Sequence, residues 1–168
     1  MVSLKNQRLD RSRYSLIPRT LCFLLNGQQV LLVRYAQSKG DWAGLFNGVG
    51  GHVERGESPL NSCYREITEE TGLHPLDLRL CGVATIDAAD DLGVGLYVFV
   101  GRAEGRPVRS TPEGEPIWVP LDEVDNHPSV DDLRLLLPKA IACYRGTTPP
   151  FIAHIQPATG QPTKVDFS

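Results

Sequence analysis

The chain has 168 residues, of which 41% are apolar and 22% are charged, as is typical of one soluble globular domain. Its formal net charge of −3 argues against electrostatically driven binding to nucleic acid polymers or to anionic membranes. A phosphate-bearing small molecule stays possible, because a divalent cation can invert the local charge. No apolar stretch is long enough for a targeting or membrane-spanning segment, so we expect a cytoplasmic protein.

The four cysteines, Cys22, Cys63, Cys81 and Cys143, are far apart in the sequence and form no CxxC pair. Neither a zinc site nor a disulfide is visible in this spacing. We therefore expect free, buried thiols in a reducing compartment.

The first predicted elements are a loose arm and a hairpin. Residues 1–17 are polar and basic and predict the arm. Two apolar runs follow, at 20–25 and 30–35, and the Asn-Gly pair between them favours a tight turn. Residues 40–51, rich in glycine and containing two aromatic residues, predict an ordered loop.

A helix is predicted over residues 58–71. Ser58 suits its N-cap, Pro59 its first turn and Gly72 its end. Helical spacing predicts that one face meets the core, through Leu60, Cys63 or Tyr64, Ile67 and Thr71.

The second half of the chain mixes strands and helices without a regular alternation. Strands are predicted at 76–80, 94–100, 117–119 and 151–155, a Pro/Gly-rich loop at 106–116, and a helix at 130–144. This pattern predicts an α/β or α+β fold in which helices pack on one mixed sheet.

Three carboxylates lie on one face of the first predicted helix. Glu66, Glu69 and Glu70 are spaced i, i+3 and i+4, so their side chains are neighbours. Like charges this close repel by about 1 kcal/mol per pair at 4 Å in water. A merely solvated acidic face is the simpler alternative. The functional interpretation is that the three carboxylates converge on a hard divalent cation, which prefers oxygen ligands.

Two neighbouring features favour the cation site. Arg65 lies beside the cluster and can hold a carboxylate ionised through a forked contact. The glycine-rich turn 48–51 precedes the helix, and such backbone can approach a phosphate or offer a carbonyl to a metal.

Residues 51–73 match every fixed position of the Nudix box: Gly51, Glu57, Arg65, Glu66, Ile67, Glu69, Glu70, Gly72 and Leu73. The chain thus resembles the Nudix hydrolases, in particular their MutT-like branch. The resemblance implies an α/β/α sandwich with a mixed sheet between helices. It also implies an arm at 1–17, the Nudix domain at 18–155 and a tail at 156–168.

The resemblance implies a magnesium site, with manganese as a substitute, whose ligands are Gly50 (through its carbonyl), Glu66, Glu69 and Glu70. Glu66 is alternatively the base that activates water. Arg65 is implied to orient Glu66 during catalysis, and Glu57 to hold Arg65. A further metal-binding and catalytic acid is expected outside the box. Glu113 is the candidate, with Glu115 as its competitor and a plain surface charge as the alternative.

The base-reading residues are expected from similarity to oxidised-purine triphosphatases. Asn47 precedes the glycine turn, and its amide can donate and accept, although an Asn-Gly turn explains it equally well. Asp131 and Asp132 resemble a paired-aspartate base site. The alternative is that they are only acidic residues at the start of a helix, where the helix dipole favours negative charge. The tryptophan expected beside that pair is absent. Arg34 ends a strand and either contacts phosphate or is a surface residue.

Features typical of enzymes that act on ADP-ribose or on dinucleoside polyphosphates are missing from residues 87–91. We therefore expect a nucleoside triphosphate, oxidised or not, as substrate, with a monophosphate and pyrophosphate as products. The alternatives are a pyrophosphatase of ADP-ribose, nucleotide sugars or dinucleoside polyphosphates, and a regulatory module that binds nucleotide without cleaving it. Whether the protein is a monomer or a homodimer is left open.

Overall fold

The computed structural model describes residues 12–108, 110–157 and 163–168, so most of the predicted N-terminal arm lies outside it. The strands are β1 (Ser15–Asn26), β2 (Gln29–Tyr35), β3 (Phe46–Asn47), β4 (Asp77–Ala89), β5 (Leu92–Arg102), β6 (Gly114–Pro120), β7 (Phe151–Gln156) and β8 (Lys164–Phe167). The helices are α1 (Pro59–Thr71) and α2 (Leu133–Tyr144), with short 3-10 turns η2 (Gln37–Trp42) and η3 (Val124–Asn126).

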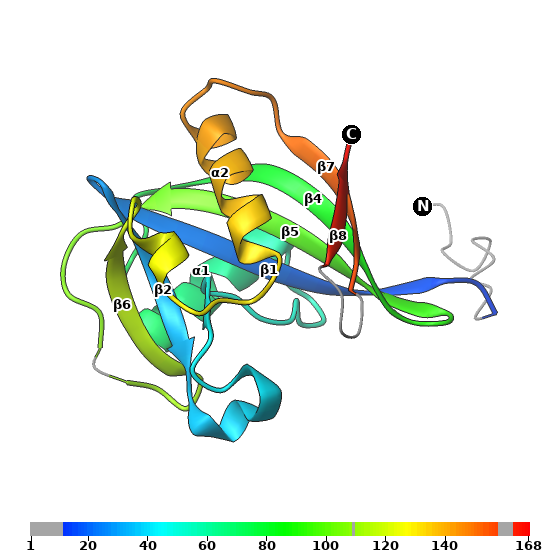
Figure 1. Ribbon diagram of the computed structural model, residues 1–168, viewed down its shortest axis with the longest axis horizontal. Coiled ribbons are helices and arrows are strands. Elements are labelled where there is room, and N and C mark those ends of the chain that lie inside the picture. Colours follow the sequence, from blue (N-terminus) through cyan, green and yellow to red (C-terminus); the bar gives the residue numbers. More distant parts are fainter. Residues whose placement is uncertain (1–11, 109, 158–162) are drawn as a thin grey trace.

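The strands form one mixed sheet in the order β3-β2-β1-β5-β4-β7-β8, and β6 pairs with β2 (Figure 1). β1 and β5 are parallel, as are β4 and β7, whereas the remaining pairs are antiparallel. The predicted hairpin of β1 and β2 is confirmed, with Leu25 opposite Val30. None of the described helices is both long and apolar enough to cross a membrane.

The helices cover opposite faces of the sheet, so the α/β/α sandwich is confirmed (Figure 1). Alternate residues of β1 divide between two cores, because successive strand side chains point to opposite faces. Phe23 is buried in the core beneath α2, together with Leu136. Leu24 is buried in the core beneath α1, together with Ile67.

The predicted limits of α1 are confirmed, but its buried face differs in part. Ser58 Oγ accepts a hydrogen bond from Asn61 N, and Gly72 ends the helix in the left-handed region at φ 68°. Cys63, Ile67 and Thr71 are buried as expected. Leu60 and Tyr64 are exposed, because the sheet contacts a narrower stripe than the apolar spacing predicted.

The second predicted helix begins later than expected, at Leu133. The backbone of 128–130 instead pairs with β3: Phe46 N donates to Pro128 O and Val130 N donates to Phe46 O. These bonds hold the segment in an extended conformation, so the helix cannot start there. Two strands also differ from the prediction. β6 begins earlier than expected, at Gly114, and β8 was not predicted at all.

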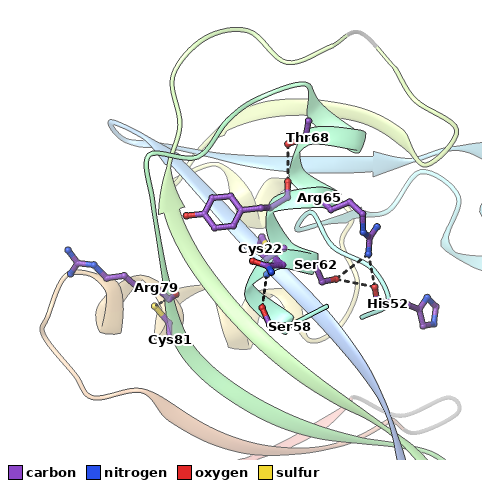
Figure 2. The surroundings of a disulfide bond; sticks show 11 residues. Cys22, His52, Ser58, Ser62, Arg65, Thr68, Arg79 and Cys81 are labelled. Carbon is purple, nitrogen blue, oxygen red and sulfur yellow. Dashed lines mark hydrogen bonds between the residues drawn. A yellow bond between two sulfur atoms is a disulfide. The ribbon is translucent and has the colours of Figure 1, made fainter. Parts of the chain in front are cut away.

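The expectation that all four cysteines are free is wrong for two of them. Cys22 of β1 and Cys63 of α1 form a disulfide with a Cα–Cα distance of 6.6 Å (Figure 2). The packing of α1 against β1 brings together residues 41 positions apart, which sequence spacing does not reveal. Cys81 and Cys143 are free, as expected.

Candidate active site

The glycine turn that precedes α1 is fixed against β1. Cys22 N donates to Val49 O, and Thr20 N donates to Gly51 O. A Cβ atom at Gly50 would overlap the Thr20 carbonyl, and one at Gly51 would overlap the Glu66 carboxylate. Glycine is therefore required at Gly50, where the overlap is with backbone, and the missing side chain at Gly51 lets Glu66 lie directly against the turn.

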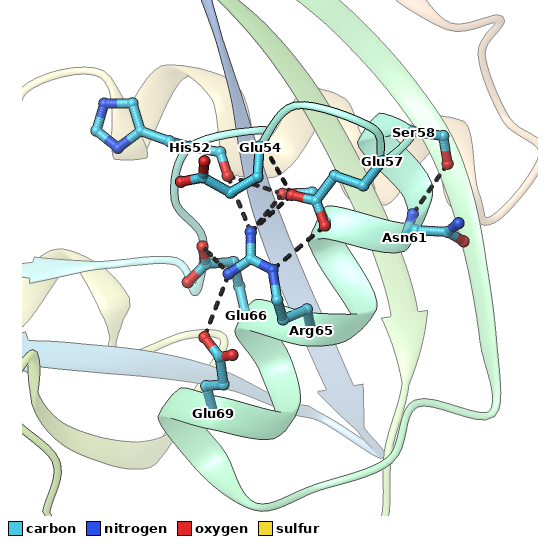
Figure 3. Close-up of polar contacts among 9 residues, drawn as sticks. His52, Glu54, Glu57, Ser58, Asn61, Arg65, Glu66 and Glu69 are labelled. Atoms are coloured by element: carbon cyan, nitrogen blue, oxygen red, sulfur yellow. Dashed lines mark hydrogen bonds and ion pairs between the residues drawn. The ribbon is translucent and has the colours of Figure 1, made fainter.

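Arg65 is the centre of a polar network that joins the loop after this turn, at His52 and Glu57, to α1 (Figure 3). Its Nη2 donates to Glu57 Oε1 at 2.7 Å and to the His52 carbonyl at 3.0 Å. Its Nη1 donates to Glu66 Oε1 at 2.7 Å and to Glu69 Oε2 at 3.2 Å. One guanidinium thus sets the positions of three carboxylates, which a lysine ammonium could not do with the same geometry.

Glu57 holds Arg65 from the loop side. The Arg65 guanidinium, and next the Glu54 backbone N–H, lower the pKa of the Glu57 carboxyl to about 2. The Glu57 and Glu66 carboxylates in turn raise the pKa of Arg65 above its ordinary value. Glu57 is therefore ionised throughout the physiological pH range, as the sequence-based role requires.

Glu70 differs from the other box glutamates, because only 5% of it is exposed. Burial, and then the negative charges of Glu66 and Glu113, raise the pKa of its carboxyl to about 8. A hydrogen bond from the Gly50 backbone acts in the opposite direction. The buried carboxyl thus lies where three acidic groups affect one another and where a positive charge would be strongly stabilising.

The structure separates the two candidates for the acid outside the box. Glu113 interacts electrostatically with Glu70 and forms an ion pair with Lys39. Glu115 lies opposite Arg34 across β2 and β6, and their side chains form an ion pair at 2.5 Å. Arg34 is therefore paired with Glu115, and it is not among the described residues that line the cavity of about 670 Å³ beside the glycine turn.

The donor set fits a divalent cation by its chemistry. Within the described parts of the chain, no three acidic, histidine or cysteine side chains are arranged to hold a metal ion as they stand. Arg65 instead occupies the oxygens of Glu66 and Glu69. However, carboxylate and carbonyl oxygens are the ligands that magnesium prefers. Burial, and then the negative charges of Glu66 and Glu113, raise the pKa of Glu70, and a bound cation would offset that repulsion.

A cavity of about 670 Å³ adjoins the glycine turn. Gly50, Asn47, Asp131 and Asp132 all line it, so the structure brings the predicted base-reading residues together. They meet because Phe46 of β3 pairs with Ser129, just ahead of the two aspartates. Asp132 makes no side-chain capping bond to α2, and burial raises the pKa of its carboxyl.

Several cavity residues were missed from the sequence. Tyr35 and Trp42 stack with ring centroids 5.8 Å apart, and Tyr35 Oη accepts a hydrogen bond from Asn47 Nδ2 at 3.0 Å. Arg19 and Thr20 of β1 also line the cavity. The Thr20 hydroxyl is buried and, within the described chain, has no hydrogen-bond partner. No motif marks these residues, because turn and sheet geometry alone brings them together.

Comparison with known proteins places this site in a family. Residues 16–140 match the profile of the NUDIX domain. The oxidized purine nucleoside triphosphate hydrolase of Mus musculus is 31% identical over 62% of this chain and 67% of its own. The RNA pyrophosphohydrolase of Mesorhizobium japonicum is 32% identical over 61% of this chain and 62% of its own.

The fold is also shared with solved structures. A MutT protein from Bacillus halodurans superposes with a TM-score of 0.71 at 24% identity, covering 91% of this chain and 98% of that one. The profile match extends over most of the chain and includes the whole network around Arg65. This chain therefore belongs to the Nudix hydrolase family.

Proposed function

We propose that this hydrolase is magnesium-dependent and cleaves nucleoside triphosphates, oxidised or not, to the monophosphate and pyrophosphate, with manganese as a substitute. The observation that carries the proposal is the position of Tyr35. Tyr35 lines the cavity, and its hydroxyl lies within electrostatic range of Glu70, Arg19 and Asp132. The acidic cluster and the cavity therefore adjoin at one residue, as a substrate with a phosphate end and a base end requires.

The metal would be held by Gly50 (through its carbonyl), Glu66, Glu69, Glu70 and Glu113. Bound there, a divalent cation would neutralise phosphate oxygens and make water a better nucleophile. The chain itself supplies the orientation of the carboxylates, because Glu57 fixes Arg65 and Arg65 fixes Glu66. Gly50 and Gly51 let the turn lie directly against Thr20 and Glu66, because a Cβ atom at either position would overlap them.

The reaction needs a proton acceptor, and an ionised carboxylate that is held in place is suited to it. Water attacks phosphorus, the bond to the bridging oxygen breaks, pyrophosphate leaves and the water proton passes to a carboxylate. Glu66 is oriented for this by Arg65, unless it serves as a ligand.

Base recognition is assigned to Asn47, Asp131 and Asp132. Asn47 Oδ1 accepts from Gly48 N at 2.8 Å and Nδ2 donates to Tyr35, so the amide is fixed while one N–H and one lone pair stay available. The name of the mouse relative supports a purine triphosphate as the substrate. Arg34 is proposed as a phosphate contact only if the substrate displaces Glu115 from it.

A hydrolysis screen tests the proposal. The full chain is incubated with magnesium and, separately, with nucleoside triphosphates, oxidised purine triphosphates, ADP-ribose and dinucleoside polyphosphates, and products are separated by anion-exchange chromatography. We expect a monophosphate and pyrophosphate from a triphosphate, no turnover in EDTA, and a loss of orders of magnitude in Glu70→Gln. Turnover of ADP-ribose alone would refute the proposed substrate, and wild-type activity in Glu70→Gln would refute the metal assignment.

A further inference from the structure

The C-terminal segment forms one wall of the substrate cavity. Ile155 of β7, Pro157 and Thr163 all line the cavity that contains Asn47 and Asp131. These three residues lie beyond position 140, where the match to the family profile ends. The family's shared region therefore does not account for this part of the cavity.

The segment is held firmly enough to act as a wall. β8 pairs with β7 from Ala153 opposite Phe167 to Gln156 opposite Lys164. Phe167 packs edge-on against Phe151 at 5.7 Å between ring centroids. Lys139 of α2 lies over the same Phe167 ring. The wall is thus fixed to both the sheet and α2.

One contact joins this wall to the base-reading aspartates. Thr163 Oγ1 donates a hydrogen bond to Asp131 Oδ2 at 2.8 Å. Asp131 is exposed and lies just before α2, so its side chain is otherwise free to change rotamer. Among the described residues, Thr163 is the side chain that donates to it.

We propose that Thr163 is a positioning residue for base recognition, whose hydroxyl holds the Asp131 carboxylate in the orientation that meets the substrate base. The inference rests on the proposed function, because it concerns the same cavity. A carboxylate held by one donor presents its other oxygen and its remaining lone pairs in a fixed direction. Holding it before the substrate arrives also removes the entropic cost of ordering that side chain on binding.

The hydroxyl is tested by Thr163→Val, which keeps the shape of the side chain and removes the donor. We expect KM for the best triphosphate to rise about three- to tenfold while kcat stays within about twofold, because a lost hydrogen bond to a charged group weakens ground-state and transition-state binding alike. Thr163→Ser keeps the hydroxyl and should restore KM to within about twofold of the wild type. Asp166→Asn, three residues further along on β8 and paired with Lys164, is the matched control and should change neither constant.

Base selectivity is a second measurement, and it does not change when only the amount of folded protein falls. The ratio of kcat/KM between the preferred purine triphosphate and a pyrimidine triphosphate is independent of the folded fraction. We expect this ratio to fall about threefold or more in Thr163→Val, by the same hydrogen-bond energy. In Asp131→Asn, adding Thr163→Val should cause little further change, because the two residues act through one contact.

The outcomes separate this inference from the proposed function. If the wild type hydrolyses no triphosphate, the proposed function fails before Thr163 is tested. If triphosphates are hydrolysed but Thr163→Val keeps both the wild-type KM and the wild-type base ratio, the positioning role is refuted and the proposed function stands. Equal losses in Thr163→Val and Thr163→Ser, or full additivity with Asp131→Asn, would also refute it.

Discussion

Replacing Glu70 by glutamine should stabilise the metal-free protein while abolishing its activity. The side chain is 5% exposed, and its pKa is raised from an ordinary value of 4.5 to about 8. The folded protein therefore favours the protonated carboxyl. The contribution of this carboxyl to the free energy of unfolding is fully present below pH 4.5, where Glu70 is protonated in both states. It is lost as pH rises towards 8, because the unfolded chain ionises at lower pH than the folded one.

The size of the effect follows from the two pKa values. Their separation corresponds to about 5 kcal/mol above pH 8 and to about 3 kcal/mol at pH 7. A neutral amide of nearly the same shape does not incur this cost. In EDTA, we expect Glu70→Gln to be more stable than the wild type by about 3 kcal/mol at pH 7, and the difference to vanish near pH 4.5.

Urea unfolding at several pH values, in EDTA and in magnesium, measures this difference. The matched control is Glu69→Gln, because Glu69 is 60% exposed and its ion pair with Arg65 is worth less than about 1 kcal/mol. Magnesium should stabilise the wild type more than Glu70→Gln, because on the proposed assignment it binds the folded state through that carboxylate. A pH-independent difference, or a Glu70→Gln variant no more stable than the wild type at pH 8, would refute the reasoning.

Three further predictions concern the surroundings of the box. Arg65→Lys should lower kcat by about ten- to a hundredfold with a near-native circular dichroism spectrum, because an ammonium cannot bridge several carboxylates as a fork does; an unchanged kcat would contradict this. Reduction of the Cys22–Cys63 disulfide should lower the free energy of unfolding by about 4 kcal/mol, because the bond closes a loop of about 41 residues. Equal urea midpoints with and without dithiothreitol would contradict this prediction. Glu113→Gln should lower kcat/KM at least tenfold and raise the magnesium concentration needed for activity. Glu115→Gln breaks only an exposed ion pair, so its kcat/KM should stay within about twofold of the wild type. The reverse order of effects would exchange the roles of the two residues.

Local signals explain why part of this fold was predictable. The limits of α1 are encoded by Ser58, Pro59 and Gly72, each of which acts within one helical turn. The start of α2 was misplaced because Phe46, more than 80 positions earlier, takes the backbone of 128–130 into a strand-like pairing. Such competition from a distant segment leaves no trace in local periodicity.

The site divides in the same way. The glutamates and Arg65 were identifiable because helical spacing makes them neighbours whatever surrounds the helix. The stacking of Tyr35 on Trp42, the Thr163 contact and the Cys22–Cys63 bond depend on which chain segments the sheet brings together. Sequence spacing carries no information about these contacts, so they emerge only from the tertiary structure.

The division of the interior into two cores has a consequence for the order in which the protein can assemble during synthesis. All described buried residues of the core beneath α1 lie between Cys22 and Ala103. The core beneath α2 instead depends on residues as late as Ile155. Nascent chains acquire structure from the N-terminus onward. The helix that carries the glutamates can therefore pack on its sheet while the ribosome is still adding β7, which lines the cavity.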